Sequence, residues 1–84
     1  MVDAETVVMA TAREILPEKA AEIRPEVSLK DLKLDSLDML EVKMRLEEKL
    51  NIDLEADIFT ATTTLRDLAR HIAAALRQNS DAGP

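Results

Sequence analysis

The sequence predicts an all-α fold, a small four-helix bundle of three main helices and one short helix. Apolar residues recur at spacings of three and four in three separate segments, which is the period of an amphipathic helix. The single glycine lies at position 83, outside all three segments. Pro17 and Pro25 mark a long connection between the first two helices, because a continuous helix cannot pass through them.

The first helix is expected over about residues 3–16. Asp3 can accept a hydrogen bond at its start, and Pro17 follows its end. One face carries small and apolar side chains with helical spacing: Val7, Val8, Thr11, Ala12 and Ile15.

Residues 17–35 form the long connection between the first two helices. Connections of this length in compact domains usually have a function or local structure of their own. Ser28 and Asp31 have the spacing of a capping box, which predicts one short helical turn. Four apolar side chains can attach the connection to a core: Val27, Leu29, Leu32 and Leu34. The connection should therefore deliver the chain to residue 35 in a fixed place.

The second main helix, residues 35–50, is the most strongly predicted one. Asp35 is a good N-cap, and Asp38 lies near the positive end of the helix dipole. The interior consists largely of good helix formers without glycine or proline, and Asn51 is a suitable stop.

A short apolar piece over residues 55–61 contains Ile58 and Phe59 and precedes the last helix. Thr64 can cap that helix, with Asp67 at the capping-box position. Its buried stripe is expected to consist of Leu65, Leu68, Ile72 and Leu76.

The helix over residues 35–50 has two apolar faces. At about 100° per residue, one stripe spans an arc of about 80° and suits a core: Met39, Val42, Leu46 and Leu50. A second arc, roughly 150° away, forms what we call the apolar ridge: Leu37, Leu40 and Met44. Glu41, Glu47 and Glu48 flank the ridge. Single exposed apolar side chains are ordinary, but such a ridge also suits a partner whose apolar groove is rimmed by lysine or arginine.

Composition excludes several classes of function. Eleven basic against seventeen acidic residues give a charge of −6, which argues against nucleic-acid binding. The absence of cysteine removes disulfides, thiolate metal sites and a cysteine nucleophile, so a thioester would need sulfur from a cofactor. His71 is the only imidazole, and we expect no catalytic residue and no metal site.

The chain contains no apolar run of membrane-spanning length and no signal-peptide pattern at its start. We expect a cytoplasmic, monomeric protein with a folded domain over residues 1–77. The polar segment 78–84 is expected to be a flexible tail.

Ser36 is the candidate functional residue. It lies near the first position of a helix, where unpaired N–H groups and the helix dipole stabilise an attached anion. The pair Asp35-Ser36 also suits a simple helix start, because both residue types favour caps. The tripeptide Asp35-Ser36-Leu37 alone does not decide between these interpretations.

The run from Asp31 to Leu50, in which Asp-Ser-Leu opens an acidic helix, resembles the acyl carrier proteins of fatty acid and polyketide synthesis. The resemblance extends through Ile52, Ile58-Phe59 and Thr63-Thr64-Leu65, and covers about residues 3–77. It implies a four-helix bundle with a long first loop.

The resemblance further implies that Ser36 carries 4′-phosphopantetheine, taken from coenzyme A by a magnesium-dependent phosphopantetheinyl transferase that Asp35 assists. Acyl groups would then travel as thioesters to a ketosynthase, an acyltransferase or other acyl-processing enzymes. The partner-facing positions of the family map onto Leu37, Asp38, Leu40, Glu41, Met44, Glu47 and Glu48.

Two departures from the family pattern affect these expectations. Many members have glycine where this chain has Lys33, and lysine adopts positive φ less readily, so the approach to Ser36 is expected to differ. Three basic residues dilute the acidic helix, which favours a discrete polyketide-type carrier over a housekeeping fatty-acid one: Lys43, Arg45 and Lys49. The alternatives are an aminoacyl, peptidyl or D-alanyl carrier, and a helical interaction module that is never modified.

Overall fold

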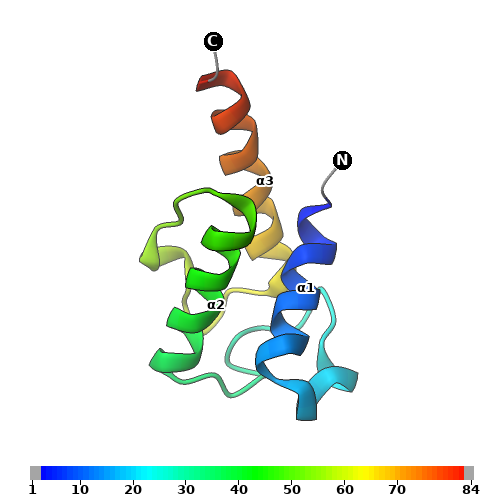
Figure 1. The fold of residues 1–84 in the computed structure, drawn as a ribbon. Helices are drawn as coiled ribbons and strands as arrows, with labels where there is room; N and C mark the ends of the chain where they lie inside the picture. Colours follow the sequence, from blue (N-terminus) through cyan, green and yellow to red (C-terminus); the bar gives the residue numbers. More distant parts are fainter. Residues whose placement is uncertain (1–2, 83–84) are drawn as a thin grey trace.

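The computed structural model describes the backbone of residues 3–82 and the side chains of residues 3–77. Three α-helices form the body: α1 (Ala4–Ile15), α2 (Ser36–Leu50) and α3 (Leu65–Ala82). Two short 3₁₀ helices complete it, η1 (Pro17–Glu22) and η2 (Ala56–Ile58). Figure 1 shows α1 packed beside both α2 and α3. The predicted all-α class, with three main helices, is confirmed.

Each main helix begins at its predicted cap. The N–H of Glu5 donates to the Asp3 carboxylate (3.2 Å), and the N–H of Asp38 donates to Asp35 (2.8 Å). Thr64 and Asp67 form the reciprocal pair of a capping box ahead of α3, at 3.2 and 3.0 Å. These local bonds fix where each helix starts.

The long connection is anchored, as the sequence predicts. Leu29 and Leu32 are completely buried, and Ser28 and Asp31 exchange both hydrogen bonds of a capping box at the start of a tight turn. The N–H of Leu29 also donates to the carbonyl of Thr63 (2.9 Å), which ties the connection to the start of α3.

The sequence pattern does not predict η1. Pro17 occupies one of the first positions of this helix, where its missing N–H costs nothing. None of the residues of η1 is buried, so it has no apolar stripe that a sequence pattern would reveal.

The core lies where the three helices and the anchored connection meet. Its largest fully buried side chains are Val8, Thr11, Leu29, Leu32, Leu46, Leu65, Leu68 and Ile72. Thr11 is the polar member, and its hydroxyl donates to the carbonyl of Val7 (2.8 Å), which satisfies the buried oxygen.

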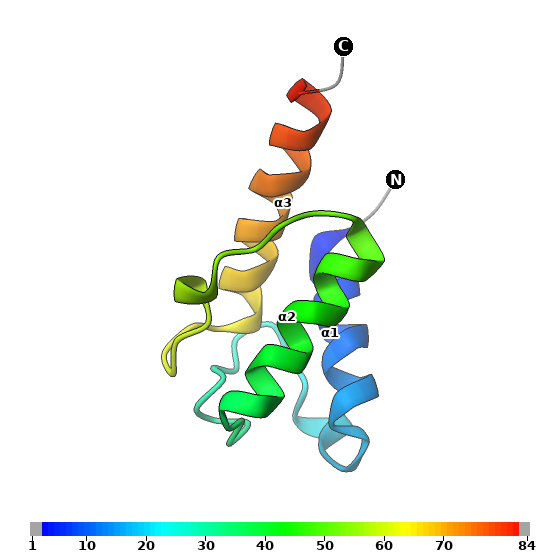
Figure 2. The ribbon, with the colours of Figure 1, turned by 60° about the vertical axis from the view of Figure 1, so that its left-hand side comes forward.

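Helix α3 continues well beyond the start of α1, as Figure 2 shows. The tail predicted for residues 78–84 begins inside this helix, but residues 83–84 and the side chains from 78 onward lie outside the described part. That tail stays a prediction. None of the helices between residues 3 and 82 is long and apolar enough to cross a membrane.

Candidate functional site

Ser36 is the first residue of α2 and is exposed. Asp35 precedes it as the N-cap, in an extended conformation, and accepts the hydrogen bond from Asp38. Among the described side chains none makes a hydrogen bond to the Ser36 hydroxyl. The hydroxyl is therefore accessible beside the positive end of the helix dipole, which suits an attached anionic group.

The chain reaches Ser36 through an unusual backbone conformation at Lys33. This residue has a φ of 57°, in the left-handed region that favours glycine. The burial of Leu32 on one side and the hydrogen bond from Leu34 N–H to the Leu29 carbonyl (3.3 Å) on the other hold the turn in place. The lysine thus adopts a conformation that its residue type disfavours, at a cost of about 1 kcal/mol.

The two apolar faces of α2 are confirmed. Val42 and Leu46 are buried, and Met39 and Leu50 pack against the same core. The apolar ridge remains at the surface, with exposed fractions of 75% for Leu37, 49% for Leu40 and 56% for Met44. These are the large hydrophobic side chains that the described surface exposes.

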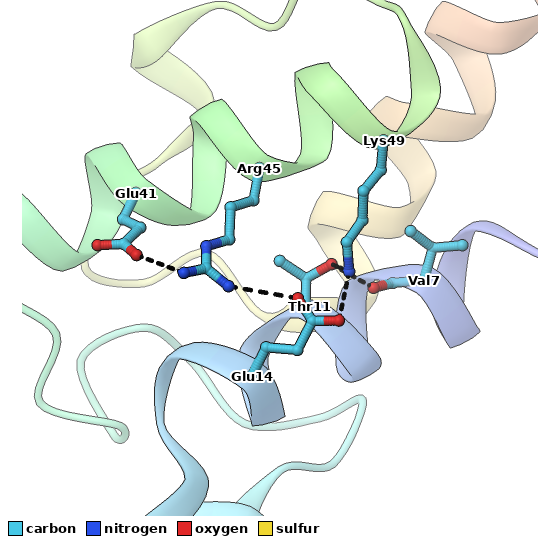
Figure 3. Close-up of polar contacts among 6 residues, drawn as sticks. All are labelled: Val7, Thr11, Glu14, Glu41, Arg45 and Lys49. Carbon is cyan, nitrogen blue, oxygen red and sulfur yellow. Dashed lines mark hydrogen bonds and ion pairs between the residues drawn. The ribbon is translucent and has the colours of Figure 1, made fainter.

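An ion-pair network joins the edge of the ridge to α1. The Arg45 guanidinium contacts Glu41 on its own helix (2.9 Å) and Glu14 on α1 (3.4 Å). Lys49 also contacts Glu14 (2.7 Å) and donates to the Thr11 hydroxyl (3.2 Å), as Figure 3 shows. The Lys49 ammonium, assisted by Arg45, holds the pKa of Glu14 below its ordinary value. The charge of Glu41 is therefore already partly balanced within the molecule.

Glu47 has different surroundings from the other predicted partner-facing carboxylates. It accepts a hydrogen bond from the N–H of Leu54 (2.8 Å) and pairs with Lys43 (3.2 Å), and its side chain is 24% exposed. The Leu54 N–H, with help from Lys43, lowers the pKa of Glu47. This carboxylate holds the segment that follows α2, whereas Glu48 is exposed and has no ion pair with any described residue.

A groove of about 280 Å³ opens beside Ser36, between α2 and the segment around η2. Its walls are mostly apolar, and its lining consists of Ser36, Met39, Leu40, Lys43, Ala56 and Phe59. The sequence identified Phe59 only as part of an apolar piece, because nothing local indicates that this segment folds back toward Ser36. An accessible hydroxyl, a helix start and an apolar groove together fit a phosphate-linked arm on Ser36.

The described residues contain no cluster of three histidine, cysteine or acidic side chains that could hold a metal ion. His71 is exposed and lies on α3, whereas Ser36 begins α2.

A protein-family model described as "Phosphopantetheine attachment site" matches residues 6–72. The chain is 36% identical over 66 residues to an acyl carrier protein of Helicobacter pylori, covering 77% of this chain and 85% of that protein. It is 37% identical over 68 residues to an acyl carrier protein of Helicobacter hepaticus, covering 80% of this chain and 90% of that protein.

The chain is also 36% identical over 53 residues to Polyketide synthase 1 of Metarhizium acridum. This match covers 63% of this chain but 2% of the synthase. No solved structure matches the chain significantly.

Proposed function

This chain belongs to the phosphopantetheine attachment family and is related to acyl carrier proteins along most of its length, and we propose from that premise that Ser36 is its attachment residue. The family defines the general activity. The protein is a carrier, not an enzyme, and holds acyl groups on a covalently bound 4′-phosphopantetheine in fatty acid or polyketide synthesis.

The observation that carries the assignment is the position of Ser36. It combines exposure, a hydroxyl oxygen without an internal partner among the described residues, and the first position of α2 directly after Asp35. A phosphodiester on this oxygen lies beside the N–H groups of the first helical turn, which stabilise its negative charge. The Asp35 carboxylate uses Oδ1 to cap the helix, and its other oxygen is left to assist the transferase.

The bound group, Ser36 and the neighbouring side chains have different roles in carrying an acyl group. The chain has no cysteine, so the sulfur of the thioester has to come from the terminal thiol of the bound group. On loading, the Ser36 oxygen would bond to the pantetheine-bearing phosphorus of coenzyme A, and the pyrophosphate P–O bond would break so that adenosine 3′,5′-bisphosphate leaves. The transferase would take up the hydroxyl proton of Ser36. Met39 and Phe59 provide apolar walls against which the attached arm can rest.

The apolar ridge is the proposed docking surface for partner enzymes. Carriers of this family interact with acyl-processing enzymes, and we propose in particular a phosphopantetheinyl transferase, a ketosynthase and an acyltransferase. Leu37, Leu40 and Met44 supply apolar contact, while Asp38, Glu41 and Glu48 attract basic partner surfaces. Glu47, the fourth carboxylate expected at this surface, is instead held by Leu54 and Lys43. The contacts with partners are weak and charge-steered, so the carrier can leave after each step as a monomer in the cytoplasm.

Loading in vitro tests the attachment residue. The full chain is incubated with coenzyme A, Mg²⁺ and a promiscuous phosphopantetheinyl transferase, and its intact mass is measured. We expect the wild-type protein and the control Ser28→Ala to gain one phosphopantetheine, and Ser36→Ala to gain none while keeping its helical circular dichroism. A wild-type chain that stays unmodified, or equal loading of Ser36→Ala, overturns the proposal. An unmodified chain would leave a helical interaction module as the remaining function.

A further inference from the structure

A second hollow lies away from Ser36, between the start of α1 and the face of α3 that is turned toward it. Its volume is about 770 Å³. The α3 wall has an apolar part, formed by Ala69, Ala73 and Leu76, and a basic edge formed by Arg66, Arg70 and Arg77. We call these six residues the basic face.

The three arginines form one stripe along α3. At about 100° per residue they fall within an arc of about 40°, next to the apolar part of the face. Arg70 and Arg77 bracket Ala73 at spacings of three and four residues. All three arginines are exposed, so their guanidinium groups line the rim of the hollow and leave the small side chains as its floor.

These arginines differ from most of the other cations near the helices. Lys43, Arg45 and Lys49 each pair with a carboxylate, but within residues 3–77 the side chains on the basic face make no hydrogen bond or ion pair. Arg70 lies near Asp67 and contributes a little to the lowering of the pKa of that carboxyl, whose main cause is its hydrogen bond with Thr64.

The acidic residues across the hollow do not neutralise the basic face. Asp3 accepts hydrogen bonds from the Glu5 N–H (3.2 Å) and the Thr6 hydroxyl (2.7 Å). These neutral donors leave the charge of Asp3 in place, so Asp3 and Glu5 set two carboxylates on the opposite wall against three guanidinium groups. In a chain of net charge −6, this local surplus of positive charge gives the face a preference for negatively charged partners.

We propose that the basic face binds an acidic amphipathic helix of a partner protein. Glutamate or aspartate side chains three, four or seven residues apart would meet the arginine stripe. Leucine or methionine side chains between them would fill the space above Ala69 and Ala73, whose small side chains allow a close approach. The apolar floor and the absence of aromatic side chains on the face favour a protein helix over a nucleic acid.

Binding at this face leaves the loading site free. The basic face shares no residue with the groove beside Ser36 or with the apolar ridge. A carrier held by α3 can therefore still present Ser36 to an enzyme, and the tether raises its effective concentration there. The proposal goes beyond carrier function and does not depend on Ser36 being the attachment residue.

Titration of the ¹⁵N-labelled full chain with a designed peptide tests the proposal. The probe has about 15 residues, is held helical by a lactam bridge, and carries glutamates at the stated spacings around leucines. We expect saturable shifts of amide signals from residues 65–77 and from the start of α1. The double variant Arg70→Glu/Arg77→Glu should weaken binding about tenfold or more, while the control Arg24→Glu should bind like the wild type.

Saturating probe should leave the KM of the transferase for the carrier unchanged within about twofold, since the two surfaces are separate. The proposal is overturned if no saturable shift occurs at millimolar probe, or if a peptide with lysine in place of glutamate binds equally well. It is also overturned if the shifts lie on α2, if the free chain shows the same shifts on concentration, or if a DNA duplex or anionic vesicles bind this face more tightly than the probe.

Discussion

The two apolar faces of α2 have similar residue types and opposite environments. Val42 and Leu46 are buried among the other helices, while Leu37 and Met44 lie at the surface less than two turns away. Hydrophobicity alone does not separate them, because both sets consist of large aliphatic side chains. Their angular position around the helix separates the two sets, because a small bundle can cover only one side of the helix.

The charged residues of α2 divide in the same way. Glu47 and Glu48 are adjacent, but Glu47 accepts the N–H of Leu54 and pairs with Lys43, whereas Glu48 is exposed and unpaired within the described residues. One carboxylate stabilises the fold and the other is available to a partner. The number of acidic residues on a helix therefore overstates the negative charge that is available to a partner. Carboxylates that are paired within the protein have to be left out of that count.

The largest effect should distinguish the buried from the exposed aliphatic face. Leu46→Ala removes a fully buried side chain, so the free energy of unfolding should fall by about 2 to 5 kcal/mol. Met44→Ala, at a position that is 56% exposed, should lower it by less than about 1 kcal/mol. Urea unfolding followed by circular dichroism measures both values. Equal losses for the two variants would show that the ridge is part of the core.

The features that the sequence predicted depend on local chemistry. Asp3, Asp35 and Thr64 cap helices through hydrogen bonds to residues two or three positions away. The two faces of α2 follow from the helical period, which needs no knowledge of the rest of the fold. Ser36 is the candidate because the run from Asp31 to Leu50 resembles acyl carrier proteins, whereas its immediate neighbours also suit a simple helix start.

The features that the sequence did not predict depend on contacts between distant segments. Glu14 meets Arg45 and Lys49 across separations of 31 and 35 residues. Phe59 comes to line a groove with Ser36 only because the chain turns back after α2. The left-handed conformation of Lys33 is likewise imposed by buried neighbours against the preference of the residue.

A smaller effect should separate the adjacent glutamates. Glu47→Ala leaves the N–H of Leu54 and the ammonium of Lys43 without their partner, so unfolding free energy at neutral pH should fall by about 1 to 2 kcal/mol. The control Glu48→Ala should change it by less than about 0.5 kcal/mol. Thermal melts of the two variants beside the wild type measure the difference.

The pH dependence of that difference follows from the lowered pKa of Glu47. Because the folded state favours the ionised carboxylate, its stabilisation is complete above the ordinary glutamate pKa of about 4.3 and is lost as the pH falls through the lower folded value. The gap between wild type and Glu47→Ala should therefore narrow in acid. A gap that stays constant from neutral pH down to about pH 3 would contradict the role of the charge.

The smallest effect should reveal which carboxylates of the ridge are free. Glu48→Gln removes an unpaired charge and should raise the transferase KM for this carrier about two- to fivefold at low salt. Arg45→Gln should lower the KM about twofold, because it releases Glu41 from its internal partner at 2.9 Å. Steady-state loading assays give both values, and both changes should disappear in high salt because screening removes exposed charge effects. If Arg45→Gln instead weakens loading, then the arginine contacts the enzyme itself and the ridge requires a partner surface of mixed charge.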